Sequence, residues 1–237
     1  MKKGILLNAT ILVFGLLAFS SCVKYDALPF TGKTLPRKSG YSTRVTNDWL
    51  YFNLRTGEIF NLEGPNKDIT EGEQYNRTDW DLAFCGYVLR TNSGTSGIGQ
   101  SGVIDLGDGG YESWTSVAQL PSDVEWVVDD DQSVYVTMSK DDWNKYLIEN
   151  NLDFDSNPWF DPNNGPAKTL TSANPLLAEA ITFAGPPPVY TPSFHTYVIR
   201  TADGQRYFKF QIISWYDANI KIGDEGGRIS YYCDELK

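Results

Sequence analysis

Short β-prone segments separated by glycine, proline and aspartate turns run through this chain, and they constrain its fold more than any other feature. In residues 207–212 every second side chain is apolar, and these side chains are expected to face inward from a strand. An Asp-Gly pair at 203–204 favours a tight hairpin turn between this segment and a strand at 194–201. The apolar run at 80–90 is expected to form one strand that is buried on both faces. Further strands are expected at 49–54, 58–62, 103–106, 133–138 and 228–232. The pattern predicts an all-β fold built as a single antiparallel β domain.

One or two short helices are expected to accompany the strands. Ser139 stands at the N-cap position of a near capping box. Trp143, Tyr146 and Leu147 follow at a spacing that places them on one face of a helix. Residues 175–183 fit either a short helix or a strand.

The composition excludes several classes of protein. Among the 237 residues, 20 are Lys or Arg and 30 are Asp or Glu, and the resulting net charge of −10 argues against a nucleic-acid-binding protein. One histidine and three cysteines exclude zinc sites made of four cysteines or of two cysteines and two histidines. No G-x-S-x-G motif and no acid–base pair at a catalytic spacing occurs in the sequence. We therefore expect a binding protein, not an enzyme, and we assign no metal site.

The first 21 residues are typical of a lipoprotein signal peptide. Lys2 and Lys3 precede a mostly apolar stretch at 5–19, which is too short for a transmembrane helix. Ser21 and Cys22 end a segment that resembles a bacterial lipobox, so Cys22 is the predicted lipidation site. An ordinary signal peptide with a cysteine at this position is the alternative. Several acyl chains on Cys22 would hold the protein stably, and the membrane would be contacted through the lipid anchor only.

Residues 22–47 are predicted to form a flexible tether. They mix proline, glycine, lysine and small polar residues without any sustained periodicity. The β domain is then expected to occupy residues 48–237.

Three short motifs carry weak chemical signals. Residues 97–102 match G-x-G-x-x-G, but a strand follows where a nucleotide site needs a helix, so we expect a loop with positive φ angles and close backbone approach. Residues 153–164 begin like a calcium-binding loop, although Pro158 replaces the glycine of its sharp turn. An irregular calcium site and a solvated surface loop both remain open there. Residues 129–131 are three aspartates that we interpret as a charged turn before a strand.

The remaining reactive and aromatic residues each allow two interpretations. Cys85 and Cys233 are expected to be buried free thiols, with a disulfide as the alternative. His195 is either a structural strand histidine or a ligand for a metal or haem. Several aromatic side chains in turn-rich segments either seal the core or bind a planar ligand, a sugar or a partner protein. These aromatic residues are Tyr111, Trp114, Trp126, Trp159 and Tyr190.

Two neighbouring segments carry a recognisable signature. Residues 79–84 contain W-D-x-A, and residues 88–99 contain R-x-N-x-G-x-S-G. A tyrosine- and phenylalanine-containing strand pair precedes them at 51–59, and a strand, an Asp-Gly turn and a lysine-phenylalanine strand follow at 197–211. Over residues 49–235 the chain resembles the HmuY family, which are haem-binding lipoproteins of Bacteroides-type bacteria.

The resemblance implies a hand-shaped all-β fold exposed on the outer-membrane surface. It also implies a role in iron acquisition, in which haem or a related iron chelate is captured and passed to a TonB-dependent outer-membrane receptor. Members of the family hold the haem iron between two histidines or two methionines. The alternative is a non-haem interaction module that binds a receptor, a glycan or a host protein through its aromatic loops.

The ligand set of this chain departs from the family pattern. After removal of the signal peptide, the chain contains a single methionine, Met138, and a single histidine, His195. Ala184 stands where some members carry a histidine before Gly-Pro. A mixed pair of Met138 and His195 requires the fold to bring them to opposite faces of the haem, and Tyr190 is a further candidate as an oxygen ligand. Five-coordinate haem, weak haem binding and another ligand stay open.

Overall fold

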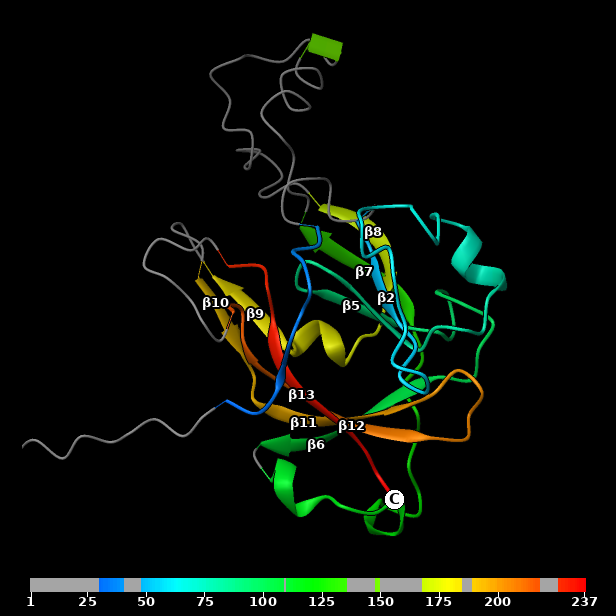
Figure 1. The fold of residues 1–237 in the computed structure, drawn as a ribbon, viewed down its shortest axis with the longest axis vertical. Helices are drawn as coiled ribbons and strands as arrows, with labels where there is room; N and C mark the ends of the chain where they lie inside the picture. Colours follow the sequence, from blue (N-terminus) through cyan, green and yellow to red (C-terminus); the bar gives the residue numbers. More distant parts are fainter. Residues whose placement is uncertain are drawn as a thin grey trace, which may run out of the picture. The chain divides into compact units, whose positions relative to one another are not determined.

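The computed structural model describes residues 30–40, 48–108, 110–135, 148–149, 168–184, 189–217 and 226–237. Antiparallel strands dominate this part of the chain (Figure 1). The strands are β1 (Lys33–Thr34), β2 (Leu50–Phe52), β3 (Ile59–Phe60), β4 (Leu82–Cys85), β5 (Val88–Thr91), β6 (Gly102–Asp108), β7 (Asp130–Tyr135), β8 (Lys168–Ala173), β9 (Ile181–Ala184), β10 (Val189–Pro192), β11 (His195–Arg200), β12 (Tyr207–Ser214) and β13 (Ser230–Glu235). Short 3-10 helices connect them: η1 (Glu73–Asn76), η2 (Tyr111–Ser113), η3 (Val117–Gln119) and η4 (Leu177–Glu179). The predicted all-β class, with a single antiparallel β domain, is confirmed.

The helix predictions have two outcomes. The helix expected after Ser139 lies outside the described residues except for Ile148 and Glu149, which are helical. Residues 175–183 form both of the alternatives, because η4 leads directly into β9. Among the described residues, no helix has the length and apolar character needed to cross a membrane.

Two larger sheets and two hairpins make up the fold. The five-stranded sheet has the order β1-β13-β12-β11-β6, and the four-stranded sheet has the order β3-β2-β4-β5. The hairpins β7–β8 and β9–β10 form separate two-stranded sheets. The Asp-Gly turn joins β11 to β12 as predicted, and Gly204 adopts a φ of 73° there.

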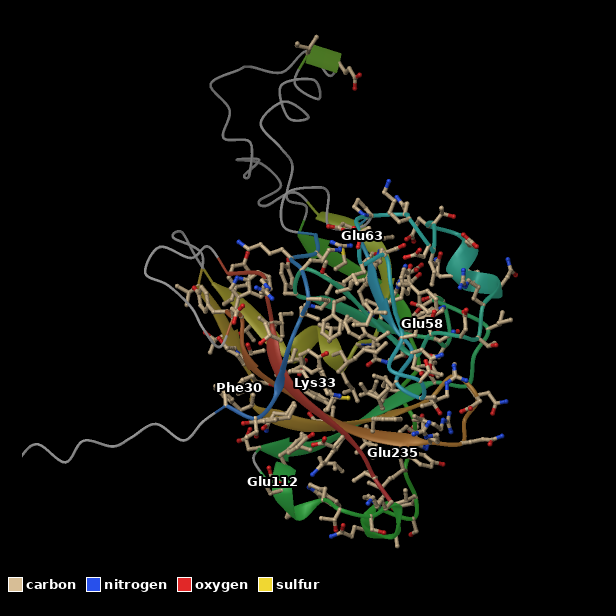
Figure 2. All side chains as sticks on the ribbon, in the orientation of Figure 1. Phe30, Lys33, Glu58, Glu63, Glu112 and Glu235 are labelled. Carbon is tan, nitrogen blue, oxygen red and sulfur yellow. The ribbon has the colours of Figure 1, made fainter. Side chains whose placement is uncertain are left out.

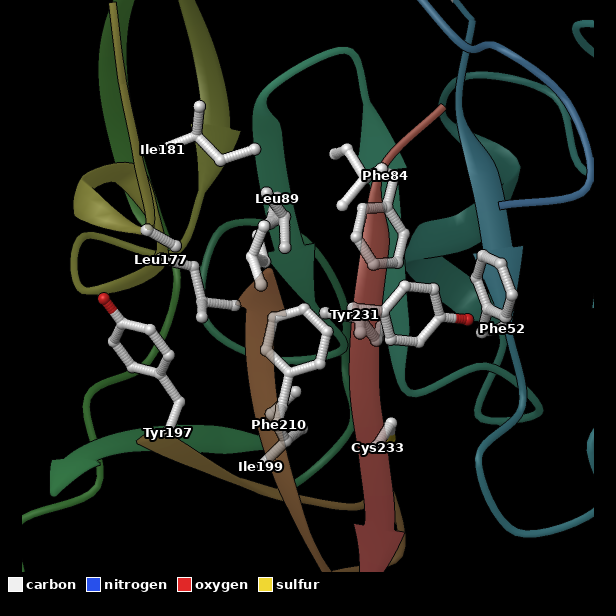
Figure 3. Packing of buried hydrophobic residues seen from close by; sticks show 14 of the residues in the cluster. Phe52, Phe84, Leu89, Leu177, Ile181, Tyr197, Ile199, Phe210, Tyr231 and Cys233 are labelled. Carbon is white, nitrogen blue, oxygen red and sulfur yellow. The ribbon is translucent and has the colours of Figure 1, made fainter. Parts of the chain in front are cut away.

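The main core lies between the two larger sheets (Figure 3). Phe84 of β4 contacts Phe210 of β12 and Tyr231 of β13, with ring centroids 6.1 and 5.8 Å apart. Phe208 and Ile212 also belong to this core, so the inward alternation predicted for residues 207–212 is confirmed. Burial of these large rings is the main free-energy gain that holds the two sheets together.

The prediction of one continuous strand at 80–90 is wrong. The segment forms the hairpin β4–β5, in which Cys85 pairs with Val88 around a turn of Gly86 and Tyr87. Gly86 adopts a φ of 59°, a left-handed conformation that glycine takes without steric cost. All residues of both strands are buried, so the run is continuously apolar although the chain reverses within it.

Residues 33–40 form a strap that is part of the fold. Strand β1 pairs with β13, and Leu35 is fully buried in the main core. Lys33 lies against β13, where its Nζ donates to the Cys233 carbonyl at 3.1 Å (Figure 2). At the other end of the strap, the Gly86 N–H donates to the Ser39 carbonyl at 2.8 Å. The predicted tether at 22–47 therefore contains, in its described part, a segment that contacts both larger sheets, and residues Gly32–Lys237 form one compact unit.

The glycine-rich loop at 97–102 owes its glycines to crowding. A Cβ atom on Gly97 would lie 2.2 Å from Asn92 Oδ1, and one on Gly99 would lie 2.5 Å from the Asn92 carbonyl oxygen. The expected close approach is thus confirmed. The expected positive φ angles are wrong at Gly97, Gly99 and Gly102, none of which has a φ in that range.

The three consecutive aspartates are not a simple charged turn. Asp129 is only 2% exposed and binds buried polar groups, whereas Asp130 and Asp131 already belong to β7. The interpretation of Asp129 as part of a charged turn is therefore wrong, because its polar partners come from distant parts of the chain.

Cys85 and Cys233 are both free and buried, as predicted. Cys233 faces the main core between the sheets, while Cys85 belongs to a second apolar cluster on the other face of the four-stranded sheet. Burial raises the pKa of the Cys233 thiol to about 12 and raises the pKa of the Cys85 thiol as well.

Candidate functional site

The two hairpins β7–β8 and β9–β10 carry the segments in which ligand residues are expected. Strand β8 ends at Ala173 and is followed by η4 and then by β9, so η4 connects the hairpins; it is the yellow coil in Figure 1. Met138 lies outside the described residues, three positions after the last residue of β7. The second hairpin places Ala184 opposite Val189 at its outer end.

An aromatic group lies beside the second hairpin, near its turn. Tyr190 of β10 stacks on Trp215, which follows β12, with ring centroids 4.2 Å apart and an interplanar angle of 15°. Tyr87, from the β4–β5 turn, lies 5.9 Å from Tyr190 between ring centroids. Trp215 is 2% exposed, and its Nε1 has no hydrogen-bond partner in the part of the chain that the structure describes. Tyr190, which is partly buried, thus covers a buried tryptophan ring near the turn of the second hairpin.

Sequence reasoning found Tyr190 but missed Trp215 and Tyr87. The sequence pattern places Tyr87 in the interior of a single strand, and Trp215 follows a strand whose periodicity ends before it. No local signal in the sequence brings these three residues together.

His195 lies at the start of β11 beside the edge strand β6. Its Nδ1 is 2.7 Å from Asp105 Oδ2, and its Nε2 is 2.8 Å from Asp108 Oδ1. The hydrogen bond to Asp105 raises the pKa of the imidazole, and the charges of both carboxylates add to this effect. Because both ring nitrogens are occupied, one of these contacts must break before His195 can coordinate iron.

Two of the predicted ligand candidates, Tyr190 and His195, therefore have different surroundings. Tyr190 packs against Trp215, while His195 is held by two carboxylates of β6. Within the described ranges, no group of three or more histidine, cysteine, aspartate or glutamate side chains is arranged to hold a metal ion. The calcium-loop candidate at 153–164 lies outside those ranges.

Most of the loop aromatics are packed. Trp114 and Trp126 belong to a third apolar cluster on the outer face of the five-stranded sheet. Tyr111 is buried and donates to Asp234 Oδ2 at 2.8 Å. The side chains of these three residues therefore pack against the rest of the protein. Trp159 lies outside the described residues.

The signature segments form a buried polar scaffold. Asp81 is fully buried and accepts hydrogen bonds from the backbone N–H groups of Leu54 at 2.8 Å and Ala202 at 2.7 Å. Arg90 is 1% exposed and lies 3.7 Å above the ring of Trp49. These contacts join strands and turns that are far apart in the sequence.

A family model agrees with this architecture. The model described as HmuY protein matches residues 45–233. The chain belongs to the HmuY family. No curated protein matches the sequence.

Solved structures share the HmuY fold of this chain at low sequence identity. A protein from Bacteroides vulgatus, classed as HmuY-like and haem-binding, has a TM-score of 0.51 and 16% identity, covering 81% of this chain and 86% of that one. Apo PinO from Porphyromonas gingivitis has a TM-score of 0.53 and 14% identity, covering 88% of this chain and 99% of that one. The apo HmuY analog of Tannerella forsythia has a TM-score of 0.50 and 16% identity, covering 90% and 99%.

Proposed function

We propose that this HmuY-family chain is a non-enzymatic surface lipoprotein that captures haem or a related iron chelate and passes it to a TonB-dependent outer-membrane receptor. The family match over residues 45–233 is the observation that carries the proposal. The similar protein from Bacteroides vulgatus is classed as haem-binding, which supports haem as the ligand.

The ligand would bind between the ends of the two hairpins. Met138 follows β7 closely, and its thioether is a suitable ligand for haem iron. Tyr190, which stacks on the buried ring of Trp215 and is itself only partly buried, would supply apolar contact for the porphyrin and is the candidate oxygen ligand. His195 is the least favoured of the three candidates, because coordination would cost it a contact with Asp105 or Asp108.

A haemin titration tests this proposal. The chain beginning at Val23, which lacks the predicted signal peptide and the acylated cysteine, is titrated with haemin under oxidising and reducing conditions while the Soret absorption is followed. We expect a saturable one-to-one change, which weakens in Met138→Ala and Tyr190→Phe. His195→Gln serves as the comparison variant and should change the affinity least.

The outcomes separate the two classes of function. A flat titration in both redox states would contradict haem capture and favour the non-haem interaction module. A loss of affinity confined to His195→Gln would assign the iron to the histidine and overturn the ligand assignment made above.

Lipidation and surface exposure are tested independently of the ligand. Cells expressing the full chain are labelled with a palmitate analogue, and intact cells are treated with protease. We expect label on the wild-type protein, no label on Cys22→Ser, and cleavage of the wild-type protein from outside the cell. Labelled protein that resists external protease would contradict the surface location while leaving the anchor intact.

A further inference from the structure

A buried carboxylate joins the start of the first hairpin to the four-stranded sheet. Asp129, directly before β7, is 2% exposed. Its Oδ2 accepts a hydrogen bond from the Thr91 N–H at 2.7 Å, and its Oδ1 accepts one from the Thr91 hydroxyl at 2.6 Å. A carboxylate held in this way by β5 fixes where β7 begins.

One asparagine joins the end of the same hairpin to the second hairpin. Asn174, directly after β8, is fully buried, and its Nδ2 donates to Asp129 Oδ1 and to the Val127 carbonyl, each at 3.0 Å. Its Oδ1 accepts from the Leu176 N–H at 3.2 Å, and its own N–H donates to the Leu89 carbonyl at 3.0 Å. The same side chain therefore contacts the base of β7 and the entry to η4, which leads into β9.

The glycine-rich signature loop closes this network from the other side. The Thr95 N–H donates to the Asp129 carbonyl at 3.0 Å, and the Asp129 N–H donates to Ser93 Oγ at 3.2 Å. A Cβ atom on Gly94 would lie 2.0 Å from the Asp129 carbonyl oxygen, so only glycine fits there. Asp129 is consequently enclosed by polar groups of β5, the loop and Asn174.

We infer that Asp129 and Asn174 are positioning residues that hold both hairpins as one unit, so that order in one hairpin is transmitted to the other. An isolated two-stranded hairpin is only marginally stable, and its geometry depends on what fixes its base. Buried polar networks of this kind hold a single arrangement when every member is bonded and lose it when one member is removed. The inference rests on the proposed function in one respect, namely that the ends of these hairpins hold the ligand.

Hydrogen exchange tests the coupling without any ligand. Asn174→Ala should lower the protection of backbone amides in both β8 and β9, although only β8 adjoins the substituted residue. Asp81→Asn is the matched control, since Asp81 is also a fully buried residue bonded to backbone N–H groups, but none of its described hydrogen bonds goes to either hairpin. If Asn174→Ala does not fold, the test uses Thr91→Val instead, because this variant removes a single hydroxyl from the same network.

Haemin dissociation tests the consequence for binding. We expect Asn174→Ala to release haemin about 10- to 100-fold faster than wild type, which corresponds to the loss of hydrogen bonds to a charged group. Asp81→Asn should change the rate less than twofold. Equal acceleration in both variants, or loss of protection confined to β8, would overturn the inference. If wild type binds no haemin, the proposed function fails, while hydrogen exchange still decides whether the hairpins are coupled.

Discussion

Substitution of Leu35 measures whether the strap at 33–40 belongs to the folded domain. Leu35 is fully buried among the side chains of the main core, its N–H donates to the Ile229 carbonyl at 2.9 Å, and its carbonyl accepts from Arg228 Nε at 3.2 Å. Leu35→Ala keeps these backbone contacts and removes the buried side chain. Such substitutions lower the free energy of unfolding by about 3 kcal/mol. In a domain of this size, that loss lowers the Tm by roughly 6–12 °C.

The measurement is thermal and urea unfolding of the chain beginning at Val23, followed by tryptophan fluorescence. Leu62→Ala is the control, because Leu62 is 42% exposed and its truncation should cost less than about 0.5 kcal/mol. A chain that begins at Asp48 loses the whole strap and should be less stable than Leu35→Ala. Equal midpoints for Leu35→Ala and Leu62→Ala, or for chains beginning at Phe30 and Asp48, would refute the reasoning and restore residue 48 as the start of the domain.

Two further predictions concern Asp129 and the glycine that packs against Trp215. Burial raises the pKa of Asp129 from 3.8 to about 6, so the folded state binds its proton more tightly, and the stability that this proton provides is lost as the pH rises from about 4 to 6. Between pH 4 and 7, the free energy of unfolding measured in urea should fall by up to about 3 kcal/mol more in wild type than in Asp129→Asn. Parallel pH profiles for the two proteins would contradict this prediction. Gly226→Ala should destabilise the protein more than Gly57→Ala. Both glycines have a φ near 80°, but a Cβ on Gly226 would lie 2.3 Å from Trp215 Cδ1, while nothing lies within 4 Å at Gly57. Equal thermal-unfolding midpoints for Gly226→Ala and Gly57→Ala would contradict this prediction and show that the Trp215 ring moves to accept the Cβ atom.

The parts of the fold that were predicted correctly are those with one buried face. Residues 207–212 alternate because Phe208 and Phe210 face the core while Lys209 and Gln211 point to the other side of the sheet. The β4–β5 hairpin was missed for the opposite reason. Its strands are buried on both faces, so no polar side chain marks the reversal at Gly86.

The site residues depend on contacts that no local pattern reveals. Asp129 is 38 residues from Thr91 and 45 residues from Asn174 along the chain, and without those partners an acidic triplet resembles a solvated turn. His195 is 90 residues from Asp105, so the sequence shows a lone strand histidine where the structure has an ion-paired one. The sequence predicts a tether at residues 33–40, because the burial of Leu35 depends on pairing with the last strand, which no local pattern shows.

The HmuY signature and the candidate iron ligands lie in different segments of the chain. Asp81, Arg90 and Asn92 of the signature are all at most 1% exposed, and their side chains bond to the Ala202 N–H, to Glu71 and to the Trp80 carbonyl, respectively. These contacts stabilise the sheets and their connecting turns. The candidate ligands lie elsewhere, with Met138 just beyond β7 and Tyr190 in β10. Substitution of Tyr190 removes none of these three scaffold bonds. We therefore expect the hairpins, and the Asp129–Asn174 network that holds them, to determine which ligand binds. The signature residues stabilise the two larger sheets.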